Sequence, residues 1–142
     1  MINFKPIEPK DREIFERFYP LKTIQNSESS FANLCAYSFI YNGEWAIIDN
    51  CLVTRIHFEK NSHICYHYPI GNGDKDKIIE KLINYSKENN VVMSVICEKK
   101  DRKPCFEHNF NIKEERDFFD YLYLREDLAD LKGKKLQSKR NH

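Results

Sequence analysis

The sequence predicts an α+β fold with one mixed, mostly antiparallel sheet flanked by helices. Helical and β-rich segments follow one another in the order helix, helix, three strands, helix, strand, helix, strand, helix. The 142 residues, 41% of them apolar and 32% charged, suit one domain with an ordinary hydrophobic core. No internal repeat or low-complexity segment interrupts this pattern.

The first two helices follow a short extended segment. Asp11 is the expected N-cap of a helix over residues 11–20, which a proline ends. A serine, Ser29 or Ser30, is expected to cap a second helix that ends at Gly43. The expected apolar stripe of this second helix consists of Phe31, Leu34, Cys35, Ser38 and Phe39.

The central region predicts strands. Residues 45–50, 51–60 and 63–70 are β-rich runs, with short polar turns at Asp49–Asn50 and at residues 60–62, which indicates an antiparallel meander. An amphipathic helix over residues 74–90 follows, and its expected apolar side consists of Ile78, Ile79, Leu82, Ile83 and Tyr85.

The last third predicts two further strands. Val91–Glu98 is a nearly continuous apolar run, typical of a buried central strand. Residues 118–124 read as another strand and residues 125–133 as a helical turn or two.

Charge and cysteine content restrict the class of protein. The net charge is +1, but residues 132–142 hold five of the 23 basic residues, which leaves 18 against 22 acidic residues in the body. Five cysteines without a C-x-x-C pair favour free thiols in a reducing compartment. The longest uncharged apolar run, residues 31–41, is about half of the ~20 residues that span a bilayer. We therefore expect a soluble, cytoplasmic protein.

The segment YPIGNGD holds the first candidate binding residues, Gly71, Gly73 and Asp74. A glycine-rich turn from a strand into a helix exposes backbone N–H groups, which suit a phosphate, a carboxylate or an acyl carbonyl. The alternative is a tight turn in which Asp74 serves only as the helix cap. The segment YPIGNGD matches neither of the nucleotide-binding patterns G-x-x-x-x-G-K-S/T and G-x-G-x-x-G.

His63, Cys65 and His67 share one face of a predicted strand. Along a strand both histidines are ~13 Å apart, too far for one zinc ion, so we expect no metal site and histidines on the sheet surface. No sequence feature marks a cysteine as a nucleophile. Asp120 falls on a largely apolar strand face, where it either pairs with a basic group of the tail or lies in solvent.

The basic tail places Lys132, Lys135 and Lys139 near one helical face. A solvated cationic face is one interpretation, and binding to RNA phosphates or anionic lipid headgroups is the other. The absence of aromatic residues within the tail weakens a role in stacking on single-stranded bases.

SSFANLCAY, YPIGNGD and DYLYLREDLADLKGKKLQSKRNH, in this order and spacing, resemble the phosphatidylglycerol lysyltransferase C-terminal-domain family. The resemblance implies an acyl-CoA N-acyltransferase-like (GNAT-like) fold, in which two such halves occur in tandem. Residues 1–131 would be the first half and residues 132–142 the start of a basic inter-domain helix, with the second half absent. Lipid-modifying members transfer an aminoacyl group from aminoacyl-tRNA to phosphatidylglycerol.

The resemblance also implies roles for residues. Its implied partners are an aminoacyl-tRNA donor, an anionic lipid or another amine or hydroxyl acceptor, the missing second half, and a second copy bound through the exposed half-domain interface. No cofactor is implied, and the acetyl-CoA signature Q/R-x-x-G-x-G/A is absent. No catalytic residue carries over; the implied substrate-binding residues are Gly71, Gly73, Asp74, Lys135, Lys139, Arg140, Asn141 and His142.

We expect the 142 residues alone to be an inactive part of an aminoacyl-tRNA-dependent acyltransferase. Two alternatives remain: a non-enzymatic module that binds tRNA or anionic lipid, and a CoA-dependent N-acetyltransferase.

Overall fold

The computed structural model describes residues 2–22, 26–58, 62–103, 107–116, 120 and 124–130. Its sheet has the strand order β1-β2-β3-β4-β6, and the short strand β5 pairs with β3 beside this path. The strands are β1 (Lys5–Pro6), β2 (Glu44–Ile48), β3 (Cys51–Phe58), β4 (His63–His67), β5 (Ile70–Gly71) and β6 (Val92–Ile96). The α-helices are α1 (Arg12–Phe18), α2 (Phe31–Tyr41), α3 (Lys75–Glu88) and α5 (Arg125–Asp130).

The predicted antiparallel meander is confirmed, because β2 pairs with β3 and β3 with β4 in antiparallel register. Asp49 and Asn50 join β2 to β3 with φ angles of 45° and 61°. Two successive left-handed residues form the turn whose twist matches that of the flanking strands, and Asp and Asn tolerate this conformation well. Polar turn residues therefore fix the register of the hairpin.

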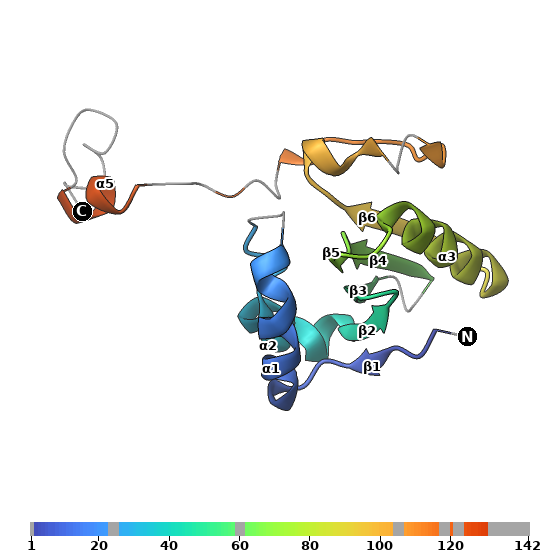
Figure 1. The fold of residues 1–142 in the computed structure, drawn as a ribbon, viewed down its shortest axis with the longest axis horizontal. Helices are drawn as coiled ribbons and strands as arrows, with labels where there is room; N and C mark the ends of the chain where they lie inside the picture. The colour runs from blue at the N-terminus through green and yellow to red at the C-terminus, as the bar shows by residue number, and fades with distance from the viewer. Residues whose placement is uncertain are drawn as a thin grey trace.

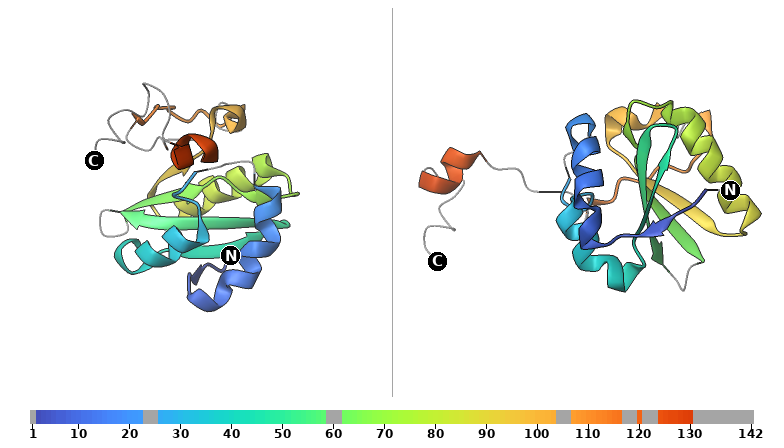
Figure 2. Two further views of the ribbon diagram at one scale, coloured as in Figure 1. Left: turned by 90° about the vertical axis from the view of Figure 1, so that its left-hand side faces the viewer. Right: turned by 60° about the horizontal axis from the view of Figure 1, so that its bottom comes forward.

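The fold class is confirmed as well. Helices α1 and α2 come between β1 and β2, and α3 crosses over from β4 to β6, which runs parallel to β4. Figures 1 and 2 show α1 and α2 on one face of the sheet and α3 on the other. This mixed, mostly antiparallel sheet between helices is the predicted α+β architecture. No helix in the described part of the chain is long and apolar enough to cross a membrane.

The prediction of a central strand at Val91–Glu98 was wrong in its position. Among the described strands, β6 ends the sheet order, and 66% of the surface of Val92 is exposed. A short apolar run indicates burial but does not indicate which partners provide it. Asp120 and Leu124 lie outside any strand, and the other residues of the predicted strand 118–124 fall outside the described ones. The expected helical turns are present as α5.

Alternating side chains of the central strands enter two separate cores. The core under α3 contains Val53 and Tyr66 with Ile78, Ile79 and Leu82 of the helix. The core under α1 and α2 contains Trp45 and Leu52 with the remaining buried residues Ile7, Phe15, Leu34 and Ile70. The sheet is thus covered on both faces, and most residues of its central strands β3 and β4 are buried.

Two of the expected helix caps are confirmed. Ser30 Oγ accepts a hydrogen bond from Asn33 N at the start of α2, and Asp74 Oδ1 accepts one from Lys77 N at the start of α3. Asp11 is the N-cap residue of α1, as expected, but its side chain makes no capping hydrogen bond to that helix. Its buried carboxylate accepts hydrogen bonds from Trp45 Nε1 at 3.0 Å and Glu8 N at 2.9 Å instead of capping α1. The indole N–H needs a partner inside the core, and sequence spacing does not show this need.

We expect Phe15→Ala to lower the free energy of unfolding by about 3–5 kcal/mol, since Phe15 is fully buried against Phe31 and Trp45. The matched control is Phe39→Ala. Phe39 was predicted on the buried stripe of α2, but 80% of its surface is exposed, so this change should stay within about 0.5 kcal/mol. Urea denaturation of both variants measures the difference, and equal losses would contradict the core assignment.

Candidate functional site

The candidate site lies where two parallel strands separate. β4 and β6 pair as far as His67 and Ile96, and the N–H of Tyr68 still donates to Ile96 O at 3.0 Å. The chain then turns away, because Ile70 of β5 pairs with Leu52 of β3. Ligands of open sheets with parallel strands bind beyond the carboxyl ends, at the point where neighbouring connections diverge. The carboxyl end of β4 has this geometry.

Two polar side chains are buried at this point. His67 Nδ1 and Thr54 Oγ1 share a hydrogen bond of 3.0 Å, and both residues are almost fully buried. Burial lowers the pKa of His67 to about 4, and the positive charge of Lys22 acts in the same direction. The imidazole is therefore neutral at neutral pH.

Lys22 is the cation next to this imidazole. It is half-buried, its Nζ lies 5.4 Å from the ring centroid of Tyr19, and it donates to Asn26 O at 3.4 Å. Burial lowers the pKa of Lys22, and the negative charges of Glu98 and Asp120 oppose this shift. The ammonium group is thus partly desolvated, which strengthens its interaction with any negative charge nearby.

Asp120 brings the C-terminal region to the same place. Its two carboxylate oxygens accept hydrogen bonds from the backbone N–H and the hydroxyl of Ser27, each at 2.7 Å. These bonds lower the pKa of Asp120, with a smaller contribution from the charge of Lys22. Of the two sequence interpretations, the exposed carboxylate is the observed one, although Asp120 lies outside any strand. It fixes the loop that contains Asn26, the partner of Lys22.

We call Tyr19, Lys22, Thr54, His67 and Asp120 the β4-end site. Lys22 supplies positive charge, and a partly desolvated cation stabilises an oxyanion strongly. His67 adds no competing charge, since its imidazole stays neutral. Its depth and its bond to Thr54 suit a positioning role better than proton transfer to a substrate.

Sequence reasoning missed most of the β4-end site. His67 was expected on the sheet surface, and this prediction was wrong because α1 and α2 cover that face. His63 is partly buried and bonds Ser94 Oγ at 2.9 Å. Lys22 was not singled out, since a lysine after a helix is usually a surface residue. The aromatic and apolar residues on both sides of His67 were the available signal for burial.

Gly71 and Gly73 pack tightly against the β2–β3 turn. A Cβ atom on Gly71, whose φ is +150°, would lie 2.3 Å from Asn50 O, and one on Gly73 would lie 2.0 Å from Asp49 O. Gly73 N also donates to Cys51 Sγ at 3.2 Å. These contacts explain both glycines as parts of a tight turn, the alternative considered above. A substrate-facing role for Gly71, Gly73 and Asp74 stays a prediction.

The remaining predicted binding residues belong to the basic tail. Lys135, Lys139, Arg140, Asn141 and His142 lie outside the described residues. Their binding role therefore also stays a prediction.

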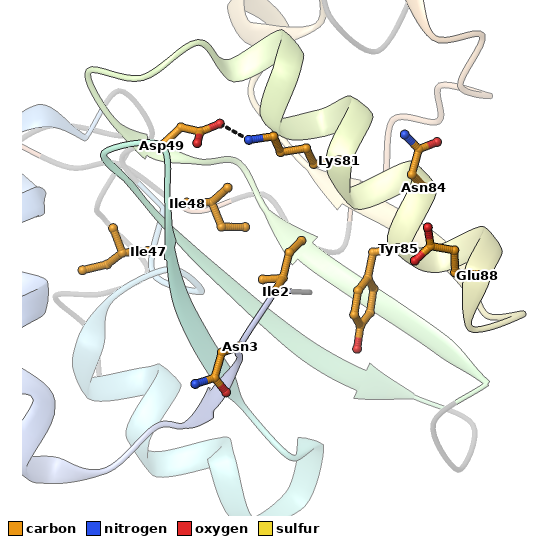
Figure 3. Close-up of a pocket in the computed structure, with 9 residues that line it drawn as sticks. All are labelled: Ile2, Asn3, Ile47, Ile48, Asp49, Lys81, Asn84, Tyr85 and Glu88. Carbon is orange, nitrogen blue, oxygen red and sulfur yellow. Dashed lines mark hydrogen bonds and ion pairs between the residues drawn. The ribbon is translucent and has the colours of Figure 1, made fainter.

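A surface pocket of about 460 Å³ lies on the other side of the sheet, between α3, the end of β2 and the N-terminal arm. Figure 3 shows the ion pair between Lys81 of α3 and Asp49 at one end of the pocket. The ring of Tyr85 extends from the helix at the other end. The Lys81–Asp49 distance is 2.6 Å, so this pair already satisfies both charges. The pocket is separate from the β4-end site.

We expect the stability of the protein to fall as the pH is lowered through the window between the unfolded pKa of His67, 6.5, and the folded value of about 4. The unfolded state binds a proton there and the folded state does not. From about pH 7.5 to about pH 4.5 the loss due to His67 should be about 2–3 kcal/mol. Urea denaturation of the wild type and of His67→Gln isolates the contribution of His67 to the free energy of unfolding, since glutamine does not titrate. Parallel pH profiles for the two proteins would contradict a buried neutral imidazole.

Solved structures similar to this chain include one from a Bacteroides species and one from a Clostridium species. A conserved protein of unknown function from Bacteroides thetaiotaomicron is 34% identical over 100% of this chain, with a TM-score of 0.81. A predicted acetyltransferase from Clostridium acetobutylicum, solved with acetyl-CoA, is 17% identical over 91% of this chain and 98% of its own, with a TM-score of 0.48. The chain spans about half, 49%, of the Bacteroides protein.

No curated protein matches the chain significantly. The family model described as "Phosphatidylglycerol lysyltransferase, C-terminal" matches residues 20–142. This range contains the loop of the β4-end site, the meander, α3 and β6. The chain belongs to the phosphatidylglycerol lysyltransferase C-terminal family.

Proposed function

We propose that this chain is one GNAT-like half of an acyltransferase that moves an aminoacyl group from aminoacyl-tRNA to an amine or hydroxyl acceptor, such as an anionic lipid. In this proposal residues 1–131 are the half-domain, and residues 132–142 are the start of the segment between the two halves. Family membership over residues 20–142 supports the reaction class. The observation that carries the proposal is the partly desolvated Lys22 beside a neutral His67 at the carboxyl end of β4.

Aminoacyl transfer makes modest demands on protein side chains. The donor ester is already activated, so the enzyme has to hold the acceptor near the carbonyl carbon and stabilise the oxygen that becomes negative. In our proposal the Lys22 ammonium group faces this oxygen. The loop held by the Asp120–Ser27 bonds keeps Asn26 O against Lys22 Nζ, and the neutral His67 supports the site without adding charge.

The second part of the proposal is that this chain is only one half of the enzyme. The chain covers 49% of the Bacteroides protein, which supports a role as one half of a longer unit. We propose that the isolated half binds the donor without completing transfer, and that it works in the cytoplasm, where charged tRNA is available.

The proposal is tested by filter binding of the chain to charged and uncharged tRNA at low salt. We expect charged tRNA to bind about tenfold more tightly, because one hydrogen bond to a charged group contributes ~1.5–3 kcal/mol. Lys22→Gln should remove this difference. Lys77→Gln is the matched control, since Lys77 is exposed on α3, on the opposite face of the sheet, and should preserve the difference.

Three outcomes contradict parts of the proposal. Equal affinity for charged and uncharged tRNA would contradict a binding site for the aminoacyl donor at Lys22. Thermal stabilisation by acetyl-CoA but not by charged tRNA favours an N-acetyltransferase instead. Formation of aminoacyl-phosphatidylglycerol by these 142 residues alone would contradict the proposal that the isolated half does not complete transfer.

A further inference from the structure

The outer face of α2 is an uncharged apolar surface. Residues 29–43 contain no Asp, Glu, Lys or Arg, in a chain that is 32% charged. On this helix Phe39 is 80% exposed, Ile40 53% and Tyr37 52%. Single exposed apolar residues are common, but adjoining ones on one helix face mark an interaction site.

Helices α1 and α3 show that this face is unusual among the described helices. The exposed residues of α1 include Arg12, Glu13 and Glu16, and those of α3 include Lys77 and Lys81. An amphipathic helix that faces solvent normally has such charges. The sequence of α2 provides none on any face, so its outer face has the composition of a buried surface.

The shape of the α2 face suits another copy of itself. Ala32, Ala36, Phe39 and Ile40 follow the spacing i, i+4, i+7 and i+8, so they share one side of the helix. The small residues lie towards the start of α2 and the large ones towards its end. In an antiparallel pair related by a two-fold axis near Ala36, Phe39 of each copy meets Ala32 of the other. Large side chains then fill the space above small ones.

Charge favours a protein partner over a membrane. Anionic headgroups attract basic residues that flank the apolar face. The uncharged segment is instead flanked by Glu28 and Glu44. Contacting rings of Tyr37, Tyr41 and Phe58 continue the apolar surface towards β3, at centroid distances of 6.3 and 5.3 Å.

We propose that two copies of this chain associate through antiparallel α2 helices, with Phe39 of each copy against Ala32 of its partner. The inference does not depend on the acyltransferase proposal. An 11-residue helix is about 16 Å long, and one such pair is smaller than the ~800 Å² per partner of a standard interface. A weak dimer with a Kd on the order of 10 µM is therefore expected.

Sedimentation equilibrium of the full chain between about 1 and 300 µM tests the association, over a range chosen to bracket that Kd. The wild-type mass should rise from 17.1 kDa towards twice that value. Phe39→Lys and Ala32→Glu, each alone, should remain monomeric, since each buries an unpaired charge in the symmetric pair. Glu13→Ser, an exposed change on α1, is the control and should associate like the wild type.

Mixing Phe39→Lys with Ala32→Glu provides the decisive measurement. In the mixed dimer the introduced lysine of one copy faces the introduced glutamate of the other at one end of the helix pair. The original Phe39–Ala32 contact remains at the other end, so association should return to within about tenfold of the wild type. All the altered residues are exposed, so urea denaturation should show little change in stability.

Several results would overturn the proposal. A wild type that stays monomeric at every concentration excludes the dimer, and vesicle binding that Phe39→Lys abolishes would then assign the face to a membrane. Single variants that dimerise like the wild type place the interface elsewhere. Monomeric single variants that fail to associate when mixed contradict the antiparallel register.

Discussion

The short pairing of β5 with β3 is the constraint on which the site depends. Gly71 and Gly73 approach the carbonyl oxygens of Asn50 and Asp49 so closely that neither position has space for a Cβ atom. This approach draws the chain after β4 towards β3 and away from β6. The carboxyl ends of β4 and β6 separate as a consequence, and the β4-end site lies at that point. The β2–β3 turn takes part in the same arrangement, since its left-handed Asp49 and Asn50 present those oxygens.

The two faces of the sheet differ in how their buried titratable groups are paired. On the α3 face Arg55 is almost fully buried, with Nε 2.7 Å from Glu44 Oε2 and its guanidinium group 3.8 Å from the ring centroid of Phe4. The ion pair joins β3 to β2, and the contact between the guanidinium group and Phe4 holds the N-terminal arm against the sheet. Removing Glu44 would leave the buried charge of Arg55 without this carboxylate. On the α1 and α2 face His67 stays neutral and Lys22 retains partial access to solvent. The buried cation of the α3 face is thus paired with a carboxylate, whereas Lys22 on the other face is only partly buried.

Local sequence signals predicted those features that depend on neighbouring residues. The caps Ser30 and Asp74, the Asp49–Asn50 turn and the amphipathic side of α3 were all expected, because each follows from a hydrogen bond or a periodicity within a few residues. The family resemblance implied the fold class as well. The hydrogen bond from Trp45 to the Asp11 side chain was not expected, because the two residues are 34 positions apart in the sequence.

The sequence alone indicated the order of the main helices and strands from α1 to β6, the antiparallel meander and the family, since alternation, turn residues and motif spacing are local properties of the chain. The tertiary structure alone decided which residues meet at the carboxyl end of β4. Lys22, Thr54, His67 and Asp120 come from four separate segments, and only the packing of helices on the sheet buries His67 and changes its pKa. It also decided that Phe39 faces outwards, because helical periodicity specifies a stripe but not which edge of it the sheet covers.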